Sequence, residues 1–388
     1  MLGSFGAVAS NLKPSASPRA DTFVFKLHYK ITVAILIAAM LLNCMTNFIG
    51  NPINCMLGGS KIPEQTINMY CWISSTFSIP MYWTAKVGEG APHPGLGNPT
   101  DYDTHYHAYY QWVPFFLFLQ ALLFYGPHYI WRLVDNGKMK CIVQGLDSTS
   151  MILKEEERKK KEKILGDYFI QNLHGHNSWS FKFVFCEILN FVNVIGNIYF
   201  TDKFLGYQFT TYGSEAVSFL RQPLESRVDP MVKVFPRVTK CTFHMYGPSG
   251  SIQQHDALCV LALNIINEKI FLFIWFWFVI LAVITGLQLV HRFATLGSPL
   301  FRHSLLSRRA RFNTKSEVDA VIRKCQFGDW FLLSSLDRNL NSFVFSEFMS
   351  DLALELDTGS SNNMEMAPLN PSAPEYSLAS IPDKEKFC

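Results

Sequence analysis

The sequence predicts an all-α integral membrane protein: a four-transmembrane-helix bundle with a small disulfide-stapled extracellular domain and a helical cytoplasmic domain. Three observations predict this class. Charged residues make up only 17% of the 388 residues, whereas about 25% is typical of soluble proteins. Four apolar stretches approach the length of about 20 residues that a helix needs to cross a bilayer. Lys and Arg gather in alternate segments between those stretches. The low net charge of +3 does not favour nucleic acid as a partner.

The four apolar stretches differ in strength. Residues 31–50 and 108–131 contain no Asp, Glu, Lys or Arg, and residues 269–291 contain the most apolar run of the chain. Residues 183–201 are less apolar, because Glu187 and three asparagines interrupt them. A buried helix of a soluble domain has a similar composition, but the position between two strong spans favours a further membrane span.

The distribution of Lys and Arg predicts the orientation in the membrane. Ten lie in residues 132–182 and eleven in residues 292–388, whereas residues 51–107 hold two and residues 202–268 hold six. Because short cytoplasmic loops are enriched in Lys and Arg, both termini and the middle loop are expected in the cytoplasm. Residues 1–30 contain no continuous apolar core, so no cleavable signal peptide is expected.

Four cysteines fall in the two predicted extracellular loops: Cys55 and Cys71 in the first, Cys241 and Cys259 in the second. The extracellular side is oxidising, so these four are expected to form two disulfides. Four cysteines allow three pairings, and their spacing alone does not choose among them.

A polar stripe runs along the third span. Its members follow a spacing of three, three and four residues and share about one third of the helix surface: Glu187, Asn190, Asn193 and Asn197. Lipid does not solvate such a stripe, so it faces protein or water. Hydrogen bonding between helices and the lining of a cation pore both fit, and we favour the first.

Two further features lie at or near the second span. Pro114 and Pro127 predict bends, since a proline inside a helix removes a backbone hydrogen bond. Just before the span, acidic and histidine side chains alternate at Asp101, Asp103, His105 and His107. Such groups can bind a divalent cation or respond to pH, but a solvated loop is the favoured reading, and no metal site is predicted.

Catalytic motifs are absent from the sequence. It contains no P-loop, GxSxG, HExxH or CxxC pattern, and the pair His174-x-His176 is too short to indicate a metal site. The sequence therefore predicts no enzyme and no cofactor.

Several motifs resemble those of the innexins, the gap-junction proteins of invertebrates. The first is a signature at the start of the second span, formed by Tyr109, Tyr110, Gln111, Trp112, Val113 and Pro114. The others are Phe235-Pro-Arg-Val-Thr-Lys-Cys241, Cys259-Val-Leu through Asn264, Asn267-Glu-Lys269 and Trp275-Phe-Trp277. Together with four spans and two cysteines in each extracellular loop, the resemblance covers about residues 25–350.

The resemblance implies a subunit of a large-pore channel. Identical or related subunits would assemble in the lipid membrane, an octamer being expected, and two such hemichannels would dock between cells to pass ions and small metabolites. The N-terminal segment matches the family's pore funnel in position, which makes Leu2, Gly3, Ser4 and Phe5 candidates for the pore lining. A nested pairing, Cys55 with Cys259 and Cys71 with Cys241, also fits the family. An undocked, pannexin-like hemichannel and a non-conducting structural or regulatory junction subunit remain alternatives.

The expected organisation has ten segments. They are the cytoplasmic pore-funnel segment (1–30), the first span (31–50), the first extracellular loop (51–107), the second span (108–131), the cytoplasmic loop (132–182), the third span (183–201), the second extracellular loop (202–268), the fourth span (269–291), the cytoplasmic helical region (292–357) and a disordered tail (358–388).

Overall fold

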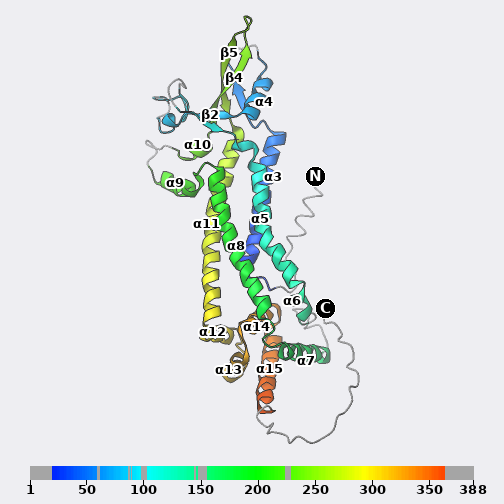
Figure 1. Ribbon diagram of the computed structural model, residues 1–388. Coiled ribbons are helices and arrows are strands. Elements are labelled where there is room, and N and C mark those ends of the chain that lie inside the picture. The colour runs from blue at the N-terminus through cyan, green and yellow to red at the C-terminus, as the bar shows by residue number, and fades with distance from the viewer. Residues whose placement is uncertain are drawn as a thin grey trace, which may run out of the picture. The chain divides into compact units, whose positions relative to one another are not determined.

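The computed structural model is mostly helical and contains one five-stranded antiparallel sheet (Figure 1). It describes residues 20–58, 62–85, 88, 90–97, 103–143, 146, 155–222 and 229–362. The chain divides into two compact units, which are described in turn. The first unit comprises Met1–Lys26, Pro127–Leu189 and Gly286–Cys388, and the second comprises Leu27–Gly126 and Asn190–Thr285.

Within the described residues, four helices are long and apolar enough to cross a membrane. They are a first helix made of α2 (Phe23–Lys26), a π-helical turn (Leu27–Thr32) and α3 (Val33–Ile49), followed by α5 (Val113–Asp135), α8 (Asn177–Phe204) and α11 (Ala262–Gly297). Most of these helices extend past the predicted apolar stretches, because their end turns carry polar residues that a search for apolar runs does not count. The second helix instead begins later than predicted.

In the second unit, segments of all four long helices share one apolar core. Leu36 of α3, Phe124 of α5, Val194 of α8 and Phe278 of α11 are all buried in it. This packing gives the four-helix bundle that the sequence predicts. Polar side chains also join helices here: Trp277 Nε1 donates a hydrogen bond to Thr32 Oγ1 over 2.9 Å.

The second unit also contains a sheet that the all-α prediction did not include. The strands are β1 (Asn54–Met56), β2 (Thr76–Ser78), β3 (His105–His107), β4 (Val238–Tyr246) and β5 (Ile252–Val260), in the order β1-β5-β4-β2-β3. Helix α4 (Glu64–Ser74) lies beside β4 (Figure 1). We call β1–β5 and α4 the sheet domain. Two short helices, α9 (Phe209–Arg221) and α10 (Met231–Val234), precede β4.

The long hairpin β4–β5 is the largest part of the sheet. Its turn closes through hydrogen bonds from Gly247 N to Ser251 O (2.7 Å) and from Gly250 N to Gly247 O (2.9 Å). Gly250 has a φ of 79°, a conformation that glycine adopts readily and other residues rarely adopt. The turn therefore fixes the register in which Cys241 faces Ala257.

Helices make up the described part of the first unit. Besides the ends of the long helices it contains α6 (Lys138–Ile142), α7 (Glu155–Gln171), α12 (Pro299–Arg309), α13 (Lys315–Lys324), α14 (Phe327–Asn339) and α15 (Ser342–Asn362). Helix α15 runs to Asn362, so residues 358–362 are helical and the predicted disordered tail begins too early. Residues 363–388 lie outside the described part of the chain.

An aromatic cluster joins the long helices of the first unit to α14. The ring of Phe183 lies 5.4 Å from Phe25, 4.8 Å from Trp131 and 5.1 Å from Phe331, measured between ring centroids. Aromatic pairs at these distances contribute about 0.5–1.5 kcal/mol each beyond the burial of their surface. The Phe331 side chain thereby connects the C-terminal helices to the ends of the long helices.

Candidate functional site: the sheet domain and its anchor on the second long helix

Two disulfides join the segment of the sheet domain from the first predicted extracellular loop to the segment from the second. Cys55 of β1 is bonded to Cys259 of β5, and Cys71 of α4 is bonded to Cys241 of β4. This is the nested pairing. The first bond follows from the register, because Cys55 and Cys259 lie directly opposite each other in the β1–β5 pair. The bonds span 204 and 170 residues of sequence, so they tie distant segments into one domain.

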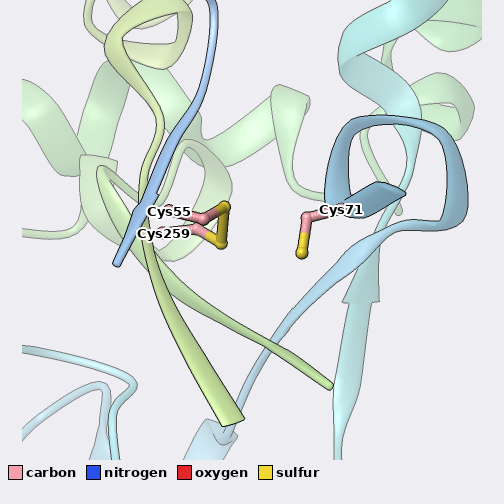
Figure 2. Close-up of side chains that lie close together, drawn as sticks. All are labelled: Cys55, Cys71 and Cys259. Carbon is pink, nitrogen blue, oxygen red and sulfur yellow. A yellow bond between two sulfur atoms is a disulfide. The ribbon is translucent and has the colours of Figure 1, made fainter. Parts of the chain in front are cut away.

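The two disulfides lie side by side in a buried apolar cluster. Ile53, Ile67, Ala257 and Leu261 pack around them. Figure 2 shows Cys55 joined to Cys259, with the Cys71 sulfur beside them. Among the described residues, these three sulfurs are the one group of three or more potential metal-ligating atoms that all lie within 4.8 Å of one another. All three belong to disulfides, so they are not available as thiolate ligands.

The signature at the start of the second long helix anchors this domain. Tyr110 Oη donates a hydrogen bond to Cys71 O over 3.2 Å, and Gln111 Nε2 donates one to Trp72 O at the end of α4. Tyr109 Oη donates to Val234 O over 3.1 Å. One short turn therefore holds segments from both predicted extracellular loops.

Burial keeps the hydroxyl groups of Tyr109 and Tyr110 protonated, so that they can donate these hydrogen bonds. Tyr110 is fully buried, with its ring 4.6 Å from Trp72. Burial raises the pKa of Tyr110 to about 12 and raises the pKa of Tyr109 well above its ordinary value. Both hydroxyl groups therefore keep the protons that they donate throughout the physiological pH range.

Pro114 does not bend the second long helix, which corrects the sequence prediction. Helix α5 begins at Val113, so Pro114 occupies its first turn, where a missing N–H costs no helical hydrogen bond. Phe116 N still donates to Trp112 O over 2.9 Å. The proline inside the helix is Pro127. Of the other signature residues, Val113 is buried and Trp112 is exposed.

A second anchor uses charged and amide side chains from the other motifs. Arg237 Nη2 lies 2.8 Å from Glu268 Oε2 and 3.1 Å from Asp229 Oδ2. Asn264 Nδ2 donates to Pro236 O over 2.8 Å. Because the Glu268 side chain is completely buried, this pairing determines where β4 meets the start of α11.

An asparagine ladder extends the second anchor to the first long helix. Asn43 Nδ2 donates to Asn267 Oδ1, and Asn267 Nδ2 donates to Asn264 Oδ1 over 3.4 Å. All three side chains are buried. The motif at Asn264 and Asn267 thus links α3, α11 and the segment before β4.

The polar stripe on α8 is largely buried against protein. In the first unit, Glu187 forms a bidentate ion pair with Arg292 of α11: Arg292 Nε donates to Glu187 Oε2 over 2.6 Å and Nη2 donates to Oε1 over 2.8 Å. In the second unit, Asn190 and Asn197 are buried, and Asn197 Nδ2 donates to Asn193 Oδ1 over 3.0 Å. The adjacent Thr201 accepts a bond from Gln120 of α5 over 2.8 Å. Glu187 and the neighbouring Thr201 therefore contact other long helices, whereas the role of the whole stripe stays a prediction.

The two histidines before the second long helix differ in exposure. His107 is buried and its Nε2 lies 2.8 Å from Ser78 Oγ on the neighbouring strand, whereas His105 and Asp103 are exposed. Burial, and secondarily the nearby His105, lowers the pKa of His107 to about 3. Asp101 and the pore-lining candidates Leu2, Gly3, Ser4 and Phe5 lie outside the described residues.

Acid should therefore destabilise the sheet domain through His107. Below about pH 6.5 the unfolded chain binds a proton that the folded domain does not bind until about pH 3. The folded state loses stability as the pH falls through this window, by about 2–3 kcal/mol between pH 6.5 and 4.5. His107→Gln, which can still bond to Ser78, should make thermal unfolding less sensitive to acid. The exposed His93→Gln is the control, and equal acid sensitivity in all three proteins would contradict this role.

Removing the Tyr110 hydroxyl should loosen the anchor. Tyr110→Phe leaves the buried Cys71 carbonyl without its partner, which costs about 1–3 kcal/mol. We expect a lower thermal unfolding midpoint for the solubilised protein and more rapid reduction of the disulfides. Tyr246→Phe, at an exposed tyrosine of the hairpin, should change neither. An unchanged midpoint in Tyr110→Phe would show that the contact does not anchor the domain.

Sequence inspection missed one buried polar cluster in the first unit. Asp329 of α14 accepts hydrogen bonds from His174 N (3.1 Å) and Gln326 N (3.1 Å), and its Oδ1 lies 3.1 Å from His176 Nδ1. These hydrogen bonds lower the pKa of Asp329 despite its burial. The pair His174-x-His176 was the available signal in the sequence, but Asp329, which both histidines contact, lies 153 residues beyond His176.

Four helices that are long and apolar enough to cross a membrane, with a disulfide-linked domain anchored on one of them, define a four-span membrane protein. The innexin family model matches residues 21–356. The chain is 48% identical to innexin inx2 of Drosophila melanogaster, over 92% of this chain and 96% of that protein. It is also 48% identical to innexin inx2 of Schistocerca americana, over 92% and 99%. It is 40% identical to innexin shaking-B of Drosophila melanogaster, over 89% and 93%.

The chain belongs to the innexin family. It is a multi-pass protein of the plasma membrane and a subunit of gap-junction channels, as the sequence motifs implied. Innexins form channels and are not enzymes, which agrees with the absence of catalytic motifs.

Proposed function

We propose that this chain assembles with identical or related innexin subunits into an octameric hemichannel, which docks with a hemichannel of the adjacent cell and passes ions and small metabolites. Both termini lie in the cytoplasm, and the sheet domain lies outside the cell. The excess of Lys and Arg in residues 132–182 and 292–388 supports this orientation, as does the presence of both disulfides in the sheet domain.

The observation that carries the proposal is the way in which the sheet domain is fixed. Two disulfides close it, and Tyr109, Tyr110 and Gln111 bind it to the start of α5. A surface that is ordered before contact favours docking between two cells, because ordering it during contact would cost binding energy. The two disulfides and the buried Tyr110 give the sheet domain such an ordered surface.

The far half of the β4–β5 hairpin is the docking surface in this proposal. Strands β1 and β2 pair with the near half of the hairpin. In the far half, among the described residues, the two strand segments pair only with each other: Thr242–Tyr246 and Ile252–Asp256. Tyr246 and Ile252 are 74% and 66% exposed. Exposed apolar side chains on a rigid hairpin suit contact with a facing subunit.

Recordings from cells that express only this chain test the proposal. We expect junctional current between paired cells and, for purified hemichannels, eight subunits by single-particle counting. Current in single cells without current between paired cells would support an undocked hemichannel instead. Surface protein without current in either arrangement would support a non-conducting structural subunit.

The pore lining is a separate prediction of the proposal. Leu2, Gly3, Ser4 and Phe5 carry no side-chain charge, so a funnel made from them would discriminate weakly by charge. Cysteine substitutions at these positions should react with aqueous thiol reagents and reduce the current. Substitutions at Asn190 and Asn193 of the stripe serve as the comparison. Block at Asn190 and Asn193 with no effect at positions 2–5 would reverse the assignment.

A further inference from the structure

A basic stretch begins where the last long helix ends. Helix α11 ends at Gly297, Ser298 caps α12 by accepting a hydrogen bond from Phe301 N, and Pro299 opens α12. Residues 299–316 contain four Arg, one Lys and no Asp or Glu. Clusters of basic residues directly beside a membrane span are a pattern of proteins that bind anionic lipid.

Contacts hold this stretch against the end of α11. The ring of Phe301 meets His291 edge-on, with 5.6 Å between ring centroids, and Arg302 Nη1 donates to Thr295 O over 3.4 Å. Figure 1 shows α12 directly at the end of α11. The cations of α12 therefore stay close to the boundary of the membrane-spanning helix.

Three exposed cations of the stretch have no acidic partner among the described residues. Arg309 is paired with Asp337 at 3.1 Å, and His303 contacts Asp319. Arg308, Arg311 and Lys315 are exposed, and among the described residues no carboxylate lies within ion-pair distance of them. Within the described part of the chain, these three side-chain cations make one hydrogen bond, which runs from Arg311 Nε to Arg308 O over 3.2 Å. Their charge is available to an external anion.

Two bulky apolar side chains flank the unpaired cations. Leu300 is 81% exposed and Phe312 is 76% exposed. Apolar side chains beside Lys and Arg are typical of segments that lie at a bilayer interface, with the apolar groups in the acyl boundary and the cations at the headgroups. Contact with water alone would not favour the exposure of two such large apolar side chains.

We propose that Leu300, Arg308, Arg311, Phe312 and Lys315 form a binding surface for anionic phospholipid, here called the juxtamembrane surface. The cations bind the headgroups, and the two apolar side chains enter the acyl boundary. Charge complementarity and continuity with the fourth long helix identify lipid as the occupant. The assignment to the cytoplasmic leaflet rests on the orientation proposed above, whereas the lipid preference does not.

Lipid retention by the purified full-length protein tests the juxtamembrane surface. The protein is reconstituted in vesicles of equal phosphatidylserine and phosphatidylcholine and re-extracted in mild detergent, and the bound lipid is quantified by mass spectrometry. We expect several-fold enrichment of phosphatidylserine. Each cation near an anionic surface is worth about a fivefold change in affinity, so Arg308→Gln/Arg311→Gln/Lys315→Gln should abolish the enrichment. Leu300→Ser/Phe312→Ser should lower the amount retained.

The matched control removes the same charge elsewhere in the first unit. Lys159→Gln/Lys160→Gln/Lys163→Gln changes α7, where acidic residues accompany the cations, and should leave the enrichment intact. Equal retention of both lipids by the unmodified protein, or an equal loss in the control, would overturn the proposal. Dissociation of the oligomer by the triple change at the juxtamembrane surface, with phosphatidylserine still enriched, would assign the surface to a neighbouring subunit instead. The vesicles contain no paired cell, so a failure of docking would leave this result unaffected.

Discussion

Replacing Cys71 and Cys241 together by serine should abolish junctional conductance. Their disulfide joins α4 to β4 across 170 residues of sequence, and removal of such a bond from a small extracellular module typically costs about 2–5 kcal/mol. The Tyr110 anchor would weaken with it, because α4, which carries the backbone carbonyl of residue 71 that Tyr110 binds, would no longer be tied to β4. We expect most of the protein to be retained inside the cell, as measured by surface labelling, and no current between paired cells.

The double substitution is needed because the two disulfides are neighbours. The sulfur of Cys71 lies within 4.8 Å of those of Cys55 and Cys259 (Figure 2). A single Cys241→Ser would leave a thiol placed to exchange with the other bond. Cys44→Ser, which removes a free thiol, is the control. Normal surface density and conductance in the double variant would show that the domain does not depend on this bond, and non-reducing peptide mapping that joined Cys55 to Cys71 would contradict the pairing itself.

Breaking the ion pair between Glu187 and Arg292 should destabilise the first unit by about 3–5 kcal/mol, since it leaves a buried charge without its partner. Both side chains are only 4% exposed, and the Arg292 guanidinium also lies over the rings of Phe183 and Phe331, 5.7 and 5.2 Å from their centroids. Glu187→Gln should therefore lower the thermal unfolding midpoint strongly and reduce surface delivery.

A paired substitution separates charge from packing. Glu187→Leu/Arg292→Met removes both charges and keeps most of the volume, so it should recover most of the lost stability. The exposed neighbour Lys182→Gln controls for loss of a charge at the same end of α8. If Glu187→Gln unfolds at the temperature of the unmodified protein, the ion pair does not stabilise the helices.

Hydropathy predicted the four long helices well because a membrane imposes one requirement, about 20 apolar residues in a row, that needs no knowledge of the partners. The ends were harder to predict. Tyr109, Tyr110 and Gln111 form a separate turn because their side chains bind α4 and the segment before β4. Those contacts are tertiary, so the sequence did not reveal that α5 begins at Val113 and that Pro114 lies in its first turn.

The sequence predicted the disulfide-stapled domain, but the β-sheet inside it was missed for a related reason. Three of its five strands have only three residues, and they pair with partners far away in the sequence. The hairpin did leave a signal: two nine-residue strands flank a turn that contains Gly247, Pro248 and Gly250. The cysteines gave the strongest information about the site, because the oxidising side of the membrane limits which of them can pair, and the family resemblance indicated the nested pairing.

Current between one cell with the unmodified chain and one cell with a hairpin variant tests docking through the sheet domain most directly. Tyr246→Asp/Ile252→Asp places charges on the far half of the β4–β5 hairpin, away from the disulfides and from Tyr110. We predict coupling between two cells that both express the unmodified chain, and loss of coupling when either partner carries the variant, at equal surface density and with single-cell hemichannel current retained. Equal coupling in the mixed pairs would contradict docking through this hairpin.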